Sequence, residues 1–181
     1  IVSLLQADIS YVAMHTNFDA ALGCMADLAA ERLGIRDGQP LEVTGEVKGM
    51  PVGIGKAGVL AEPVSLDALA KQVKQAFELP FVLVYGSEAA KGPVSRVAVS
   101  PGAGGSMIRY ALEQKAQVLV TGDIGHHDAI DAAAQGMAII DAGHYGLEHI
   151  FIPFMADYVK RVSGGSIEVI QAEPDFPARV L

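Results

Sequence analysis

Cysteine is almost missing from this chain of 181 residues. Its single cysteine, Cys24, has no partner for an internal disulfide, which suits a reducing compartment and favours a cytoplasmic location. Leu22 and Met25 beside it are apolar. Because free cysteine is commonly buried as a small apolar residue, we expect a buried thiol here and not a nucleophile.

Basic side chains are also scarce. The sequence has 13 Lys and Arg against 21 Asp and Glu, which gives a formal net charge of -8. Nucleic-acid binding relies on clustered Lys and Arg, and the basic residues of this chain are scattered, so no nucleic-acid partner is expected. No apolar run approaches the roughly 18 residues that a membrane helix needs, so no membrane contact is expected either.

Hydrophobic residues make up 51% of the chain, which is enough for one well-buried core in one domain spanning residues 1–181. Strands are predicted at residues 9–14, 41–47, 52–60, 81–85, 96–100, 118–121 and 137–140, with an edge strand at 166–170. Helices are predicted at 18–33, 66–77 (capped by Ser65), 107–115, 128–134 and 145–162, the last kinked or divided in two at Pro153. This alternation predicts an α/β fold, in which helices flank a mostly parallel sheet.

Histidines follow several of these strands. Four of the five lie in loops directly after a predicted strand. Open α/β sheets bind ligands beyond the carboxyl ends of their strands, where such loops meet. The sequence therefore predicts a site at this rim of the sheet. The residues expected there are His15, Asp123, His126, His127, Asp141 and His144.

His15 and Asp19 stand four residues apart at the start of a predicted helix. An aspartate in the first helical turn can stay ionised near the positive end of the helix dipole and serve as an oxygen ligand. Thr16-x-x-Asp19 also matches a capping box, in which Asp19 would only stabilise the start of the helix. Taken alone, the pattern predicts ligation and capping about equally.

His144 and Glu148 repeat this spacing. Residues i and i+4 of a helix project from one face about 5–6 Å apart, which allows them to share a metal; the alternative is an ordinary surface pair. Two such pairs in one chain, both after strands, favour a metal site. Imidazole together with carboxylate suits Zn, Fe, Mn or Ni better than Ca.

The glycine-rich loop at residues 101–106 (PGAGGS) precedes a predicted helix and is a candidate anion cradle. It matches neither the Walker A loop nor the dinucleotide fingerprint. Close packing of the backbone explains its glycines nearly as well.

Four sequence blocks carry a family resemblance: HTNFD from His15, VSPGAGGS from Val99, TGDIGHHDAIDA from Thr121 and GHYGLE from Gly143. Together they resemble the Nif-three-like dinuclear metal-centre family, whose members are also called GTP cyclohydrolase I type 2. Residues 53–77 are similar to the family's middle region in its short form, without the extra inserted domain.

The resemblance implies a site for two divalent transition-metal ions and a toroidal homo-hexamer. His15 and Asp19 match the first ligand pair, and His144 and Glu148 match the second. His127 matches a recurring histidine near the site. We assign His127 as the candidate general acid–base, because Asp123, four residues earlier, could hold its imidazole in one tautomer.

One departure from the family stands out. The family's N-terminal segment, which carries an adjacent His-His pair that also ligates metal, has no counterpart here, and His126-His127 align elsewhere. Two neighbouring metals need about four to six ligands each, so four residues leave both shells incomplete. We therefore expect an N-terminally truncated family domain, with roughly one more βαβ unit encoded upstream of Ile1.

The leading hypothesis is a metal-dependent hydrolase of the GTP cyclohydrolase I type 2 kind, acting on a small molecule such as a nucleotide or a cyclic amidine or amide. One rival is a non-catalytic scaffold that stores or delivers metal within a toroidal oligomer. Another is an interaction protein with a structural metal. An open coordination position beside a base would indicate the enzyme, whereas a saturated shell would indicate a structural metal.

Overall fold

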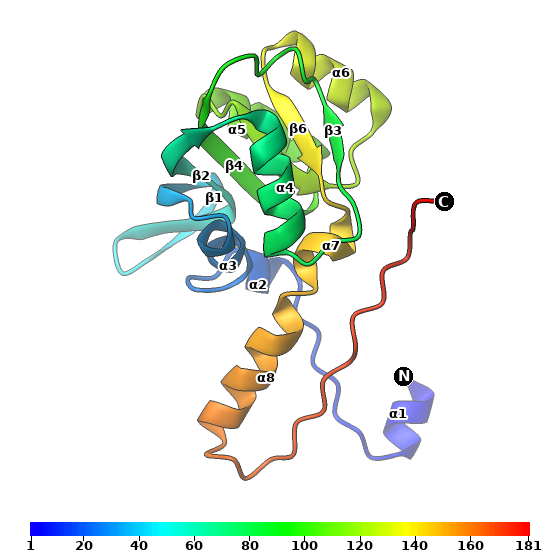
Figure 1. Ribbon diagram of the computed structural model, residues 1–181. Helices are drawn as coiled ribbons and strands as arrows, with labels where there is room; N and C mark the ends of the chain where they lie inside the picture. The colour runs from blue at the N-terminus through cyan, green and yellow to red at the C-terminus, as the bar shows by residue number, and fades with distance from the viewer.

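A computed structural model describes all 181 residues, with its helices and strands between Val2 and Val162 (Figure 1). The strands are β1 (Arg36–Val47), β2 (Met50–Val64), β3 (Leu83–Tyr85), β4 (Val94–Ala103), β5 (Val118–Gly122) and β6 (Ala138–Asp141). The helices are α1 (Val2–Gln6), α2 (Thr16–Asp19), α3 (Met25–Arg32), α4 (Leu66–Ala76), α5 (Ile108–Glu113), α6 (His126–Ala134), α7 (His144–Glu148) and α8 (Phe151–Val162). A 3-10 turn, η1 (Gly105–Met107), precedes α5.

The six strands form one sheet in the order β1-β2-β4-β5-β6-β3. The predicted α/β fold, a sheet flanked by helices, is confirmed, but the expectation of a mostly parallel sheet is wrong. Only the β4–β5 and β5–β6 pairings are parallel, and the other three are antiparallel. One cause is the tight link between β1 and β2, where Lys48 and Gly49 both have positive φ (53° and 78°). Two residues of this conformation close a β-hairpin, which makes its strands antiparallel.

The central strands are buried on both faces. In β5, Val118 and Val120 belong to one hydrophobic cluster and Leu119 to another, because successive side chains of a strand point to opposite faces. The first cluster lies beneath α3, α4 and α7, and the second lies beneath α5 and α6. This two-sided burial explains why these strands are continuous apolar runs in the sequence.

Helix α4 matches its prediction closely. Ser65 is the N-cap, and its Oγ accepts a hydrogen bond from the backbone N–H of Ala68 at 3.2 Å. The predicted apolar stripe is buried against the sheet. It consists of Leu66, Leu69, Val73 and Phe77.

Two predicted strands are absent. Residues 9–14 and 166–170 are irregular, and the side chains of Val12 and Ile170 are exposed. Neither segment pairs with a strand of the sheet. An apolar β-prone run becomes a strand only where a neighbour supplies its ladder hydrogen bonds, so local propensity alone misled the prediction.

Two predicted helices are interrupted. The helix expected at 18–33 divides between Asp19 and Met25, with Gly23 at φ +71° in the break. The helix expected at 145–162 divides after Glu148, one turn before Pro153. A proline ring collides with the carbonyl four residues earlier, here that of His149, so the break precedes the proline. Pro153 itself then sits in the first turn of α8.

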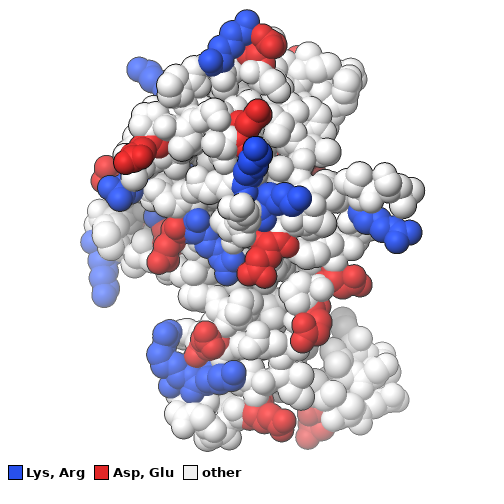
Figure 2. Space-filling model, in the orientation of Figure 1, with Lys and Arg blue, Asp and Glu red and all other residues white.

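Helix α8 extends away from the sheet, and both terminal segments run near it (Figure 1). Only Ala156 of this helix is buried, while Tyr158 and Val162 are exposed. Acidic and basic side chains are interspersed over the face drawn in Figure 2, which carries no continuous basic patch. No helix combines the length and apolar character that crossing a bilayer requires.

Replacing Ser65 with alanine should lower the free energy of unfolding by about 1 kcal/mol, because α4 loses its N-cap acceptor. Urea denaturation followed by circular dichroism measures the change. Ser65→Asp is the matched control, since its carboxylate can accept the same bond. Equal destabilisation by both substitutions would show that the cap contributes nothing.

Candidate metal centre

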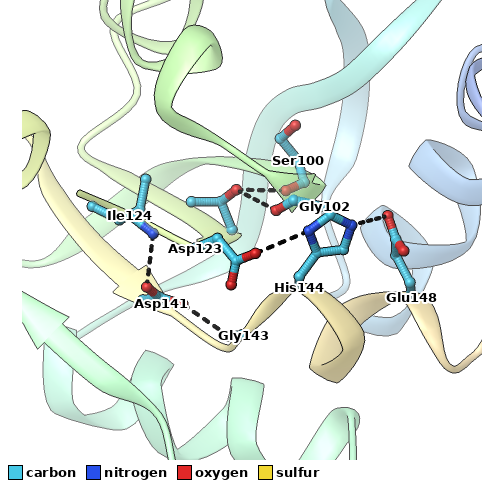
Figure 3. Close-up of polar contacts among 9 residues, drawn as sticks. Ser100, Gly102, Asp123, Ile124, Asp141, Gly143, His144 and Glu148 are labelled. Atoms are coloured by element: carbon cyan, nitrogen blue, oxygen red, sulfur yellow. Dashed lines mark hydrogen bonds and ion pairs between the residues drawn. The ribbon is translucent and has the colours of Figure 1, made fainter. Parts of the chain in front are cut away.

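The carboxyl ends of β4, β5 and β6 meet at one edge of the sheet, because these three strands run parallel. The ends of these strands and the segments that follow them carry the residues drawn in Figure 3. The first turn of α7 begins at this edge and carries His144. Asp123, Asp141 and His144 thus lie together at this edge of the sheet, where the sequence predicts them.

Asp141 ties two of these loops together. Its buried carboxylate accepts hydrogen bonds from the backbone N–H of Ile124 at 3.0 Å and of Gly143 at 2.8 Å (Figure 3). Gly122 allows the loops to approach, since a Cβ there would lie 2.3 Å from the backbone nitrogen of His144. The predicted rim residue Asp141 thus positions the loops, and its oxygens are engaged by the backbone.

His144 lies between two carboxylates. Its Nδ1 is 3.1 Å from Asp123 Oδ2, and its Nε2 is 3.3 Å from Glu148 Oε1 (Figure 3). A carboxylate only accepts hydrogen bonds, so Nδ1 carries the proton that Asp123 accepts. In the neutral imidazole, Nε2 and Oε1 are then two acceptors facing each other. A cation at Nε2 would relieve their repulsion.

Glu148 and Asp19 are both half-buried carboxylates. Burial raises the pKa of each above its ordinary value. The imidazoles of His144 and His15 oppose this rise at both carboxylates, and the charge of Asp19 adds to it at Glu148. No Lys or Arg forms an ion pair with either carboxylate. The predicted donors of the two pairs are therefore close enough to interact electrostatically.

The glycine-rich loop passes directly over the second pair. Gly102 has φ +84°, and a Cβ there would lie 2.9 Å from Glu148 Oε1 and 3.6 Å from His144 Nε2. A Cβ at Gly104 would lie 1.9 Å from Thr121 Oγ1. Close packing, the alternative to an anion cradle, accounts for these glycines.

The first pair differs from its expected form. His15 is the exposed N-cap residue of α2, and its Nδ1 lies 3.1 Å from Thr16 Oγ1. The capping box is wrong, because Thr16 lies inside the helix and no side chain caps its start. Asp19 at the end of α2 is thus left available as a ligand.

His127 is exposed and makes no hydrogen bond; its ring packs against His126 at 5.4 Å between centroids. The expectation that Asp123 holds His127 is wrong, since Asp123 pairs with His144 instead. Asp123 has φ +53°, a left-handed backbone conformation, and lies before the first residue of α6. It is therefore not part of the helix that carries His127. Sequence spacing offered no signal for a pair 21 residues apart.

No group of three or more His, Cys, Asp and Glu side chains is close enough to hold one metal. The four predicted ligands fit a transition metal by donor type, with two imidazoles and two carboxylates. They do not form a closed shell. Cys24 belongs to no such group; it is partly exposed and not buried as expected, and desolvation and the nearby Asp27 raise the pKa of its thiol.

A sequence profile described as Duf34/NIF3 (NGG1p interacting factor 3) matches residues 1–175. A Streptococcus pneumoniae protein named "GTP cyclohydrolase 1 type 2 homolog" is 34% identical over 177 residues, which are 95% of this chain and 64% of that protein. A Lactococcus lactis protein of the same name is 32% identical over 166 residues, 91% of this chain and 61% of that protein. The chain thus spans less than two thirds of the length of either relative.

The fold has counterparts among solved structures. A Bacillus cereus protein related to NIF3 superposes with a TM-score of 0.88 at 21% identity, covering 100% of this chain and 76% of that chain. At this identity the likeness concerns the fold alone.

Neutralising a buried carboxylate should stabilise the chelator-treated protein at pH 7. The folded-state pKa of Glu148 is raised above the unfolded value, so the charged form costs stability once the pH exceeds the folded pKa. Below the unfolded value of about 4 this cost disappears. Glu148→Gln should therefore raise the free energy of unfolding at pH 7 and leave it nearly unchanged below about pH 4.

Urea titrations at the two pH values measure this difference. Glu113→Gln, at an exposed glutamate of α5, is the matched control and should change stability at neither pH. A gain of equal size at both pH values would assign the effect of Glu148→Gln to packing and not to charge.

Proposed function

The chain belongs to the Duf34/NIF3 family, and from this premise we propose that it binds two divalent transition-metal ions and acts as a metal-dependent hydrolase of the GTP cyclohydrolase I type 2 kind. The metals considered are Zn, Fe, Mn and Ni. The proposed ligands are His15, Asp19, His144 and Glu148.

The observation that carries this proposal is the contact between His144 Nε2 and Glu148 Oε1. Nε2 and Oε1 lie 3.3 Å apart, and neither Glu148 nor the half-buried Asp19 has a Lys or Arg partner, so positive charge from a proton or a metal ion is stabilised here. A metal ion supplies that charge and, once bound, polarises a substrate and lowers the pKa of a bound water.

Asp123 and Asp141 position the proposed ligand His144. Asp123 accepts the Nδ1 proton of His144, which directs Nε2 toward Glu148. Metal-binding histidines commonly have such a carboxylate partner, which fixes the tautomer and makes the ring a better ligand. Asp141 fixes the backbone on both sides of Asp123 and His144 through its two hydrogen bonds.

A non-catalytic metal scaffold is the second candidate. Two observations favour it: the four donors form no closed shell, and His127 has no hydrogen-bond partner to orient its ring. Such a scaffold would store or deliver metal within a toroidal oligomer.

The proposal includes a homo-hexamer in the cytoplasm. Exposed apolar side chains on α8 and the terminal segments support self-association, because monomers rarely expose large contiguous apolar surface. They include Ile1, Leu5, Tyr11, Val12, Tyr158, Val162 and Ile170.

Each proposed ligand should be required for metal binding. Alanine at any of the four positions should lower the affinity by more than the roughly 10–100-fold lost with a supporting residue. Elemental analysis after dialysis against a metal buffer measures the change. His126→Ala, at an exposed histidine without a hydrogen bond, is the control. Unchanged metal in all four variants would refute the site.

Asp123 and His127 should have different effects. Asp123→Ala should lower metal affinity roughly 10–100-fold, because His144 loses its orienting partner. His127→Ala should leave the metal content near normal, and a fall in hydrolytic turnover of roughly 10²–10⁴-fold, the usual share of general acid–base catalysis, would assign that role to His127 without Asp123 as its partner. GTP is the first substrate to assay, with several metals near neutral pH.

The outcomes separate the candidates. If His127→Ala removes the metal, His127 is a ligand and the acid–base role fails. If the metal-loaded protein hydrolyses no nucleotide and no cyclic amide or amidine, the scaffold is the function.

A further inference from the structure

A cavity of about 450 Å³ opens beside the candidate metal centre, a volume within the usual range for small-molecule sites. Its lining includes His144, Glu148 and Asp123. It also includes apolar residues, among them Leu83 of β3 and Phe176 of the C-terminal tail. Metal ligands and an apolar wall therefore face the same space.

The C-terminal tail contacts the cavity lining through Asp175 and Phe176. The backbone N–H of Asp175 donates to Tyr145 Oη at 3.2 Å. The Phe176 ring meets the rings of Tyr145 and His149 edge to face, at 5.7 and 5.5 Å between centroids. Otherwise the tail is irregular and exposed (Figure 1), so these aromatic contacts hold Phe176 in the wall.

The charged groups of the cavity are all acidic or imidazole. Asp123, Asp141 and Glu148 line it, and no Lys or Arg does. Proteins bind phosphate groups with Arg, Lys or the N-terminus of a helix. Helix α7, at the cavity edge, is only five residues long and its first turn is occupied by His144. The triphosphate of a nucleotide has no counter-charge from this chain.

We propose that the side chains of this cavity bind an uncharged, planar nitrogen heterocycle, as a free base, nucleoside or cyclic amide, and that without bound metal they disfavour a nucleoside triphosphate. Tyr145 and Phe176 provide aromatic surface for the ring. The carboxylates of Asp123 and Glu148 accept hydrogen bonds from the ring's N–H groups. This inference rests on the proposed function and deepens it by naming the part of the substrate that the chain's own side chains recognise, which is the ring and not the phosphates.

The test compares guanosine with GTP, which share one ring system and differ in the triphosphate. The full chain is treated with chelator, since a bound metal would itself attract phosphate, and binding is measured by isothermal titration calorimetry. Guanosine should bind roughly tenfold or more tightly than GTP, because like charges repel in a partly buried site. No binding of guanosine, or GTP binding at least as tightly, overturns the proposal.

Phe176→Ala should weaken guanosine binding by roughly tenfold or more, the usual loss when a base loses an aromatic partner. Tyr158→Ala, at an exposed ring on α8 outside the cavity, is the matched control and should leave binding unchanged. Equal affinity of Phe176→Ala and the wild-type chain overturns the role of the tail.

A second variant adds a positive charge to the cavity lining without changing the tail. Leu83 is 47% exposed and lines the cavity, so polar side chains are tolerated there. Leu83→Arg should shift the preference toward GTP by roughly tenfold, and Leu83→Gln, of similar length without charge, should not. An unchanged preference in Leu83→Arg contradicts the electrostatic argument.

The two proposals can fail separately. Ring binding is measured without metal, whereas the metal proposal is tested by elemental analysis of the ligand variants. If the ligand variants lose metal and the wild-type chain binds no guanosine, the metal centre is supported and the ring site is refuted. If the variants keep their metal and the wild-type chain binds guanosine, the ring site is supported and the metal centre is refuted.

Discussion

β4, β5 and β6 lie parallel and are buried between two layers of helices, so their side chains must be apolar on both faces. Polar groups are consequently confined to the points where these strands end. Because parallel strands end at the same edge, the polar groups of three separate segments meet there. The two-sided burial of the sheet thus creates both the core and the place where chemistry can occur.

The site at this edge contains four carboxylates, and the chain pairs none of them with a Lys or Arg. Asp141 satisfies its charge with two backbone N–H groups, and Asp123 satisfies its charge with His144. Glu148 and Asp19 have imidazoles and each other nearby but no Lys or Arg partner, and burial raises the pKa of both. Half-buried carboxylates without a basic partner lower the stability of the fold. Such groups are typical of functional sites, where residues are kept for binding and not for stability.

The same acidity governs which ligand the neighbouring cavity can accept. A metal cation is attracted by these carboxylates, whereas phosphate is repelled by them. The proposed centre and the proposed ring cavity therefore depend on one distribution of charge. The aromatic wall adds selectivity by shape, and it is completed by a tail residue, Phe176, that is distant in sequence from the rest.

The sequence by itself determined the features that depend on neighbouring residues. The capped helix α4, the apolar central strands and the His144/Glu148 pair follow from periodicities of two to four residues, and the four motif blocks identified the family. Local patterns failed at residues 9–14 and 166–170, where strand propensity had no partner strand. Only the tertiary structure decided the strand directions, the pairing of Asp123 with His144, and the position of Phe176 over the cavity. These contacts join segments whose spacing along the chain carries no information, because they form only when burial of the shared core brings the segments together.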